Sequence, residues 1–363
     1  MTTLSLAMIV RDEELTLGRV LSDASAFCDE LVIVDTGSTD DTRAIAIAAG
    51  AKVVEFPWVD DFAQARNVSF EACTSDWIMW LDADDRIPAD VQNTILELKR
   101  SLLSDDWDAV SMPYRYHFDA TTGECTFTLH RERIVRRGAG YRWSGAVHEV
   151  LDVSGGRVAT RPGLYVEHRP HESKSGAKVG RNLRILERVV NSGDRSSRTM
   201  FYYGNELRDA GRYLDALKGY QEYLAAPGAV WEHYAALMSA AQCADNAGLP
   251  DEATRQLFDA LRVDPSRSEA HLALGRRHFD RREWAAALPY YAAAAAAKPP
   301  VEGFVSAEDY TWKPWDHLGV CLINLGRHKE GIDATLRSLD QGNPDVARLR
   351  ANLHWAVDQL GSA

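Results

Sequence analysis

Three aspartates, Asp82, Asp84 and Asp85, directly follow an apolar run at residues 77–81. The run has the length and the continuous hydrophobicity of a strand that is buried on both faces. Like charges at this spacing repel one another, and a bound cation is the usual way to keep them ionised. Hard divalent ions such as Mg²⁺ take one or two protein carboxylates and complete their shell with water and substrate phosphate. The spacing therefore indicates a site for a metal ion and a diphosphate.

A second acidic segment, VDTGSTDDT, places Asp35 at the end of another apolar run. Ligands of open α/β sheets lie beyond the carboxyl ends of the strands, so both segments are expected at one edge of a sheet. Each segment alone has a plainer explanation. Aspartates such as Asp85 could cap a helix that begins near Pro88, and Ser38 or Thr39 could cap the helix that follows Asp35. Together, on one parallel sheet, the two segments favour a ligand site.

The elements that must position these side chains alternate between short β-rich runs and helical patterns up to about residue 100. Their continuous hydrophobicity is typical of strands covered on both faces and predicts a doubly wound, mostly parallel α/β sheet. Residues 107–170 lack a long helical stripe and are expected to add strands and loops that close one side of this sheet. The expected strands are residues 4–10, 30–35, 52–56 and 77–82, with helices within residues 13–27, 38–50 and 61–72.

From about residue 174 to the end the pattern is helical, and it repeats. Ala253 and Ala287 are 34 residues apart, as are Pro265 and Pro299. This is the tetratricopeptide period, and it predicts four helical pairs followed by a terminal helix. The expected domains are an α/β domain at residues 1–172, a linker helix at 173–197 and an all-α tetratricopeptide-repeat domain at 198–363 with a C-terminal capping helix.

Composition limits the classes of partner. The net charge of −12 argues against nucleic acid, because phosphate recognition usually needs a basic surface. The five cysteines are far apart and show no spacing typical of disulfide frameworks or zinc sites, which fits a reducing compartment. The first apolar run is only a strand long and lacks a basic leader, and no apolar run approaches the length of a membrane span. A cytoplasmic protein without a transmembrane segment is expected.

The motifs of the N-terminal half are similar to those of the family 2 glycosyltransferases of the GT-A fold. VRDEE follows the first expected strand, VDTGSTDDT follows the second, ARN lies in the helix before the fourth, and LDADD resembles the DXD motif. The segment YRWSGAVHEVL and the C-terminal repeats narrow the likeness further. The chain resembles the bacterial subgroup that contains sublancin-type peptide S-glycosyltransferases and lipopolysaccharide-core glucosyltransferases.

The resemblance implies roles for the residues that match its motifs. Asp35 would read the nucleobase or its ribose, and Arg66 of the ARN match would approach the diphosphate unless it is an ordinary solvated helix arginine. Asp85 could share the role of either neighbouring aspartate, and His168 would complete the metal shell unless it is simply structural. The resemblance implies that the nucleotide sugar is bound by Val10, Arg11, Glu13, Asp35, Arg66, Asp82 and Ala83. It implies that the metal ion, Mg²⁺ or Mn²⁺, is bound by Asp84, Asp82 and His168.

The segment WSGAVHE corresponds to the part of the family that presents a carboxylate from the acceptor side. Glu149 is the candidate general base, since displacement at an anomeric carbon requires removal of the acceptor's proton. His148 is the competing candidate because its imidazole titrates near neutral pH. The plainer alternative is that both are polar residues on alternate faces of a strand.

The expected activity is that of an inverting, metal-dependent glycosyltransferase. It would transfer a hexose or an N-acetylhexosamine from a nucleotide sugar, most simply a UDP-sugar. A peptide Cys, Ser or Thr side chain is the first choice of acceptor, and a saccharide or lipopolysaccharide core is the alternative. The helical repeats could hold the acceptor or form a homodimer. An answer of another class is a non-catalytic tetratricopeptide scaffold with a degenerate glycosyltransferase domain.

Overall fold

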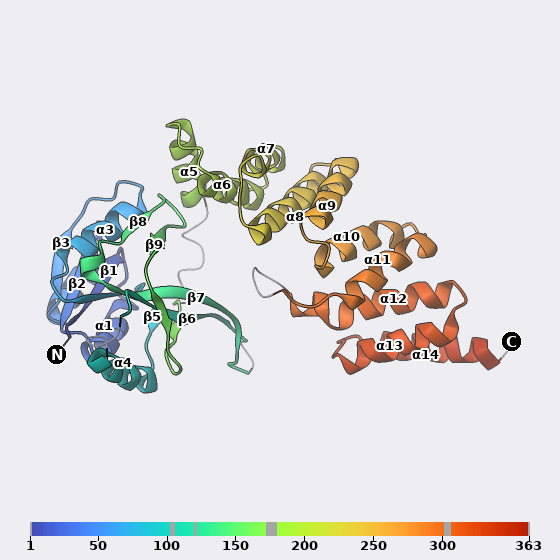
Figure 1. Cartoon of the computed structure of the whole chain (residues 1–363), viewed down its shortest axis with the longest axis horizontal. Coiled ribbons are helices and arrows are strands. Elements are labelled where there is room, and N and C mark those ends of the chain that lie inside the picture. Colours follow the sequence, from blue (N-terminus) through green and yellow to red (C-terminus); the bar gives the residue numbers. More distant parts are fainter. Residues whose placement is uncertain (1, 102–105, 120–121, 172–179, 301–305, 362–363) are drawn as a thin grey trace. The chain divides into compact units, whose positions relative to one another are not determined.

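The computed structural model describes the chain except for residues 1, 102–105, 120–121, 172–179, 301–305 and 362–363. The chain divides into two compact units, Met1–Gly193 and Asp194–Ala363. In Figure 1 the first unit runs from blue to green and contains every labelled strand, and the second consists of helices. The predicted order of an α/β domain followed by an all-helical repeat is therefore confirmed.

The first unit is built from strands and helices that alternate up to Ser101 and from strands thereafter. Its elements are β1 (Leu4–Val10), α1 (Leu17–Ser25), β2 (Glu30–Asp35), α2 (Thr42–Ala48), β3 (Lys52–Glu55), α3 (Phe62–Ala72), β4 (Trp77–Trp80), β5 (Asp85–Arg86), α4 (Ala89–Ser101), β6 (Ala109–Phe118), β7 (Cys125–Arg136), η1 (Arg137–Ala139), β8 (Arg142–Ser144), β9 (Val150–Asp152), β10 (Val158–Thr160), β11 (Val166–His168) and α5 (Arg181–Asn191).

The main sheet of this unit is mixed. Within the described residues its strand order is β3-β2-β1-β4-β7-β6-β11-β5, with β10 paired to β6, while β8 and β9 form a separate ribbon. The first four strands are parallel, and β7 is antiparallel to both β4 and β6. The segment after residue 107 thus extends the sheet itself. Because β7 reverses the direction, β6 runs parallel to β4, and the carboxyl ends of β4, β6 and β11 share one edge.

The continuous hydrophobicity of β1 and β4 reflects a core on each face of the sheet. Leu6 and Met79 pack in one core with α1 and α4, whereas Ala7 and Ile78 pack in the other with α3, β8 and β9. Alternate side chains of one strand enter opposite cores, so a polar residue on either face would be buried. Each fully buried Leu or Met contributes roughly 1.5–3 kcal/mol to stability relative to exposure.

The second unit is a row of helical pairs. Its described helices are α6 (Ser197–Asp209), α7 (Tyr213–Leu224), α8 (Val230–Asn246), α9 (Pro250–Val263), α10 (Ser268–Phe279), α11 (Trp284–Ala296), α12 (Trp312–Asn324), α13 (His328–Asp340) and α14 (Val346–Gly361), with the 3₁₀ turn η3 (Ala307–Tyr310) before α12. Each helix packs mainly on its sequence neighbour, giving four pairs and a terminal helix as the repeat period predicts.

Small residues allow the paired helices to approach closely. A Cβ on Gly275 in α10 would lie 2.9 Å from the ring of Tyr291 in α11, and one on Gly204 in α6 would lie 2.8 Å from the ring of Tyr220 in α7. Both tyrosines are buried. In these two pairs, the tyrosine ring of the second helix packs directly against a glycine of the first.

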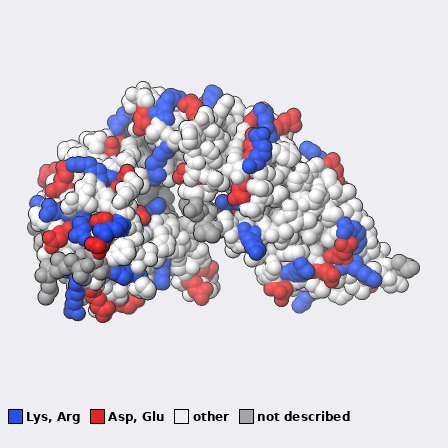
Figure 2. Space-filling view, in the orientation of Figure 1, with Lys and Arg blue, Asp and Glu red and all other residues white. Residues whose placement is uncertain are grey.

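Both units carry charged side chains on their surfaces. On the face drawn in Figure 2, basic and acidic side chains are interspersed among other residues on each unit. Among the described residues, no helix combines the length and apolarity that a membrane span requires.

Candidate active site

The carboxyl ends of the central strands bring the two acidic segments to one edge. Val10 at the end of β1 lies in register with Asp35 at the end of β2. β4 is the other neighbour of β1, and Asp82 follows it by two residues. The nucleotide-side and metal-side residues of the sequence motifs are therefore adjacent along the sheet.

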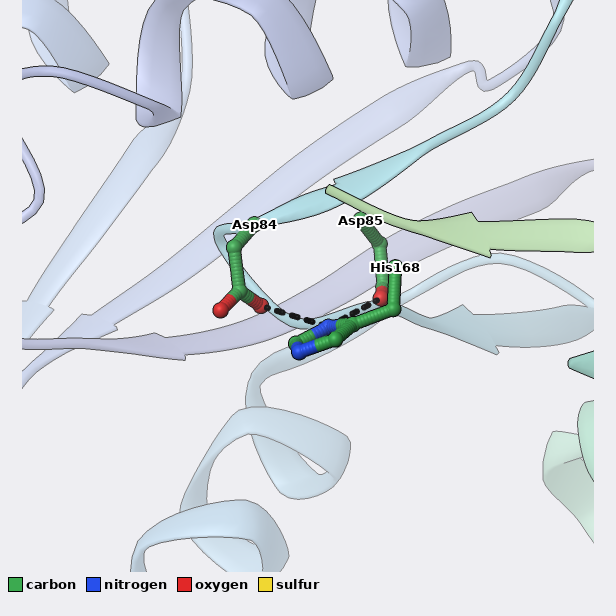
Figure 3. Close-up of side chains that lie close together, drawn as sticks. All are labelled: Asp84, Asp85 and His168. Carbon is green, nitrogen blue, oxygen red and sulfur yellow. Dashed lines mark ion pairs between the residues drawn. The ribbon is translucent and has the colours of Figure 1, made fainter. Parts of the chain in front are cut away.

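A carboxylate-imidazole group lies where β5 meets β11. Asp84, Asp85 and His168 each offer a ligand atom, and these atoms lie within 4.8 Å of one another. The Nδ1 atom of His168 is 3.5 Å from an Asp84 oxygen and 3.9 Å from an Asp85 oxygen. Dashed lines mark these two ion pairs in Figure 3. Register explains the meeting, since His168 is the antiparallel partner of Asp85. Burial lowers the pKa of His168, but hydrogen bonds and charges from the two aspartates raise it to about 9.

Asp85 is the fixed member of this group. Its carboxylate accepts hydrogen bonds from the Tyr114 hydroxyl at 2.8 Å and the Asp82 backbone N–H at 2.9 Å. It also pairs with Arg133 at 3.0 Å, and both side chains are fully buried. The interpretation of Asp85 as a cap of α4 is therefore wrong, because its oxygens turn into the sheet.

Asp84 is the carboxylate that remains open to a ligand. Its side chain is 18% exposed and has no hydrogen-bond partner other than His168 among the described residues. One carboxylate and one imidazole next to solvent suit a divalent ion that takes its other ligands from substrate and water. The residues present thus fit the expected Mg²⁺ or Mn²⁺ ion. Asp82 lies outside this group, and its role as a ligand stays a prediction.

Arg66 joins two carboxylates that are distant in sequence. Its guanidinium donates to Asp82 at 2.7 Å and to Glu149 at 2.6 Å. The same group lies 4.8 Å from the ring centroids of Trp80 and of Trp143. Only 8% of the side chain is exposed, so the interpretation of Arg66 as a solvated helix arginine is wrong.

The surroundings of Asp82 favour its ionised form. Partial burial raises the pKa of this carboxyl group, but the charges of Arg66 and Arg133 lower it to about 2. In the same contact, Asp82 and Glu149 raise the pKa of Arg66, although burial opposes the change. The three side chains therefore form a partly buried ionic group between the strand end and the segment that contains Glu149.

Glu149 and His148 lie in a turn between β8 and β9. Glu149 is 13% exposed and faces Arg66. His148 is exposed and has a φ of 54°, a left-handed conformation that side chains rarely adopt. The alternative in which the two residues alternate on a strand is therefore wrong. The structure brings Glu149 into the ionic group, while His148 is not among the contacts of Arg66.

The nucleotide-side residues are held by a network between two loops. Asp35 is 3% exposed and accepts hydrogen bonds from the backbone N–H groups of Gly37 at 3.3 Å and Ser38 at 3.2 Å. The Ser38 hydroxyl in turn accepts from the Asp12 backbone N–H at 3.0 Å. Ser38 therefore links the two loops instead of capping α2, which begins only at Thr42.

The remaining residues of this predicted set have different environments. Val10 is buried, and Glu13 donates its backbone N–H to Thr42 at 2.6 Å. The Arg11 side chain is 53% exposed. Ala83 is 7% exposed, between the two aspartates of the DXD-like motif. Arg11 is thus an exposed cation beside Asp12, 3.8 Å away, in the loop that follows β1.

Two residues support the site through contacts that sequence reasoning did not identify. Arg133 pairs with Asp85, and its guanidinium lies 3.8 Å from the Trp80 ring centroid and 4.4 Å from that of Tyr114. The Tyr114 hydroxyl lies within hydrogen-bonding distance of both Asp85 and His168. Burial raises the pKa of Tyr114 most, and the negative charge of Asp85 raises it further. The only local signal was that Arg133 directly precedes the apolar pair Ile134 and Val135 of β7.

Comparison with known proteins agrees with this geometry. Residues 5–124 match the family model described as glycosyl transferase family 2. The matched range contains β1 to β6, together with Asp35, Arg66 and the aspartates after β4. The match to this family therefore lies within the first unit.

Curated relatives of the chain carry related names. The chain is 37% identical over 154 residues to "TPR repeat-containing protein Synpcc7942_0270" of Synechococcus elongatus, covering 42% of this chain and 36% of that protein. It is 26% identical over 213 residues to "SPbeta prophage-derived glycosyltransferase SunS" of Bacillus subtilis, covering 56% of this chain and 49% of that protein. It is 32% identical over 176 residues to "Lipopolysaccharide core biosynthesis glycosyltransferase LpsC" of Rhizobium meliloti, covering 46% of this chain and 63% of that protein. The chain thus spans less than two thirds of each of these relatives.

Proposed function

We propose that this chain is an inverting, metal-dependent glycosyltransferase that uses a UDP-sugar. The observation that carries the proposal is the contact of one guanidinium, Arg66, with Asp82 of the DXD-like motif and with Glu149. The DXD-like aspartate and the candidate base are thereby held by two nitrogen atoms of one buried guanidinium. The family 2 domain and the glycosyltransferase names of the relatives support the same class.

In this proposal Glu149 removes the acceptor's proton. The acceptor's nucleophilic atom forms a bond to the anomeric carbon while the bond to the diphosphate oxygen breaks, and the proton passes to the carboxylate. A single displacement with one base inverts the anomeric configuration. Arg66 fixes the orientation of Glu149, and its approach to the diphosphate stays a prediction. His148 is the alternative base.

Asp84 and His168 would hold the ion, with Asp85 fixed beside them and Asp82 as a further candidate ligand. Bound there, Mg²⁺ or Mn²⁺ would supply stabilisation of the negative charge that grows on the departing diphosphate. Tyr114 keeps the imidazole of His168 in place through its hydroxyl, 2.9 Å from Nδ1. The nucleotide itself is proposed to contact Val10, Arg11, Glu13, Asp35 and Ala83.

The acceptor has two candidates. The resemblance to peptide S-glycosyltransferases makes a peptide Cys, Ser or Thr side chain the first choice. A relative named for lipopolysaccharide core biosynthesis supports a saccharide instead. The helical unit is proposed to bind acceptor or to form a homodimer, and the protein is proposed to act in the cytoplasm with a hexose or N-acetylhexosamine as the transferred sugar.

A Glu149→Gln variant tests the mechanism. It should bind UDP and metal like the wild type, yet transfer or hydrolyse the donor at least 100-fold more slowly, because the amide cannot take up the proton. Glu71→Gln is the matched control, since Glu71 is an exposed glutamate of the same unit that pairs with Arg142. A wild-type rate in Glu149→Gln removes this residue from the mechanism. UDP binding without turnover on any acceptor would favour the scaffold alternative.

A further inference from the structure

A pocket of about 510 Å³ lies next to the proposed metal group. Its lining is Arg19 of α1, residues 116–118 at the end of β6, and residues 168–171. The ends of β6 and β11 lie at the same edge of the sheet as Asp84. The volume is in the range of pockets that bind small ligands.

The described residues that line this pocket make it basic. They include two arginines and three histidines but no Asp or Glu. Arg19 is exposed, and its guanidinium has no ion-pair or hydrogen-bond partner among the described residues. Arg169 is held in place by Glu167, 3.1 Å from its Nε, and by the Phe118 ring at 3.4 Å. One cation is therefore available to a ligand and the other is positioned, which favours an anionic group.

Aromatic rings form the rest of the wall. Tyr116 is stacked on His168 with centroids 4.6 Å apart and an interplanar angle of 2°. Tyr116 is nevertheless 37% exposed, and Phe118 is partly buried beneath Arg169. Rings of this kind offer apolar surface with polar atoms at their edges, which suits the C–H faces and hydroxyl groups of a sugar ring.

Strand order separates this pocket from the proposed nucleotide site. Asp35 and Val10 end β2 and β1, the aspartates follow β4, and the pocket lies at β6 and β11. In the strand order β4 and β7 separate β1 and β2 from the pocket strands, and the metal group lies beside the pocket, at β11 and β5. His168 belongs to both the metal group and the pocket. A molecule in the pocket would thus lie next to the metal group, on strands other than those that end at Val10 and Asp35.

We infer that this pocket binds the acceptor and that the acceptor is a carbohydrate carrying a phosphate or a carboxylate. Arg19 pairs with the anionic group, and Tyr116 and Phe118 contact the sugar ring. The inference rests on the proposed function and deepens it, because it selects the saccharide over the peptide as acceptor.

Calorimetric titration of the whole chain tests this inference while Mn²⁺ and UDP occupy the donor site. The probes are glucose 6-phosphate, glucuronate and glucose. Both anionic sugars should bind at least tenfold more tightly than glucose, and Arg19→Gln should remove that advantage without changing the affinity for UDP. The matched control is Arg100→Gln, because Arg100 is another exposed helix arginine of the same unit.

Several results would overturn the inference and leave the proposed function standing. Equal affinity for glucose and glucose 6-phosphate, or an unchanged advantage in Arg19→Gln, shows that the pocket does not read the anion. Competition between glucose 6-phosphate and UDP assigns the pocket to the donor's diphosphate. An acidic peptide that binds through Arg19 in place of the sugars assigns the pocket to a peptide. Failure of UDP to bind counts against the proposed function instead, and the sugar titrations without UDP still decide the pocket.

Discussion

The two units of the chain bury charge in different ways. In the sheet unit two buried arginines form the ion pairs Arg66–Asp82, Arg66–Glu149 and Arg133–Asp85, which gather at one edge and join different segments of the chain. In the helical unit the buried charges are dispersed. Arg267 pairs with Glu269 at the start of α10, and Asp316 of α12 pairs with Arg348 of α14.

The clustered pairs of the sheet unit indicate a functional site, whereas the dispersed pairs of the helical unit indicate a structural role. Burying an ion pair costs desolvation energy that its attraction often does not recover, so a concentration of such pairs is hard to explain by stability alone. In the sheet unit the pairs surround the carboxylates that the motifs assign to a ligand, and perturbed groups of this kind cluster at functional sites. In the helical unit each pair joins neighbouring parts of the repeat.

The largest expected effect is on the stability of the sheet unit. Arg133→Met leaves Asp85 buried without its cation, and it should lower the free energy of unfolding by roughly 3–5 kcal/mol. Urea denaturation measures the change. Arg136→Met is the matched control, because Arg136 lies on the same strand with 38% of its side chain exposed, and it should cost far less. Equal losses in the two variants would contradict a special role for the buried pair.

The second prediction is a loss of activity with no loss of stability. Asp84→Asn preserves the shape of the side chain but removes its charge, so transfer should fall by about 100-fold or more, or about 2.7 kcal/mol in barrier height. The urea midpoint should stay near that of the wild type, because among the described residues the Asp84 side chain contacts only His168 as a polar partner. Asp106→Asn, a change at a 92% exposed carboxylate of the same unit, should leave the rate unaltered.

The third prediction is a loss of stability in the helical unit without a loss of UDP affinity. Gly275→Ala forces a methyl group to within 2.9 Å of the Tyr291 ring, which should cost roughly 1–3 kcal/mol of stability. Gly361→Ala places the same group where nothing lies within 4 Å and serves as the control. UDP affinity should be the same in both variants. A loss of UDP affinity in Gly275→Ala alone would show that the helical unit takes part in donor binding.

The smallest expected effect is at α5, where Arg184 and Arg188 contact Asp60 at 2.7 and 3.0 Å. The hydrogen bond from Arg184, assisted by Trp58, lowers the pKa of Asp60 to about 2. Because the folded pKa is below the usual value, this contribution is complete above about pH 4 and is lost as the pH falls toward 2.

Asp60→Asn should therefore reduce stability by roughly 0.5–1 kcal/mol at pH 7, since both arginines are more than half exposed and solvent weakens the attraction. Urea midpoints of wild type and variant should converge as the pH is lowered from 4 to 2. Asp61→Asn controls for the neighbouring position, where the carboxylate accepts from Gln64. A difference that grows on acidification would contradict the assignment.

The sequence predicts what depends on local pattern. Strand β1, the 34-residue repeat and the acidic edge follow from hydrophobic runs and their spacing. The boundaries are less predictable where side chains from another loop intervene. The helix expected from residue 38 begins at Thr42, because Ser38 and Thr42 accept backbone hydrogen bonds from the first loop.

The ionic contacts of the site were not predictable from the sequence, because strand pairing creates them. Arg133 reaches Asp85 only because β7 inserts between β4 and β6. Glu149 reaches Arg66 only because β8 packs on α3, where Asn67 binds the backbone of Trp143. A motif gives the residue types that meet, whereas the register of distant strands decides which oxygen each cation contacts.

The most direct test of the central claim is a calorimetric titration of UDP into the chain with Mn²⁺, with EDTA, and in Asp84→Asn with Mn²⁺. A metal-dependent nucleotide site at the edge of the sheet predicts tight binding by the wild type with Mn²⁺ and at least tenfold weaker binding in the other two conditions. Equal UDP affinity in all three would contradict the assignment of Asp84 and His168 as the metal site on which the proposed activity depends.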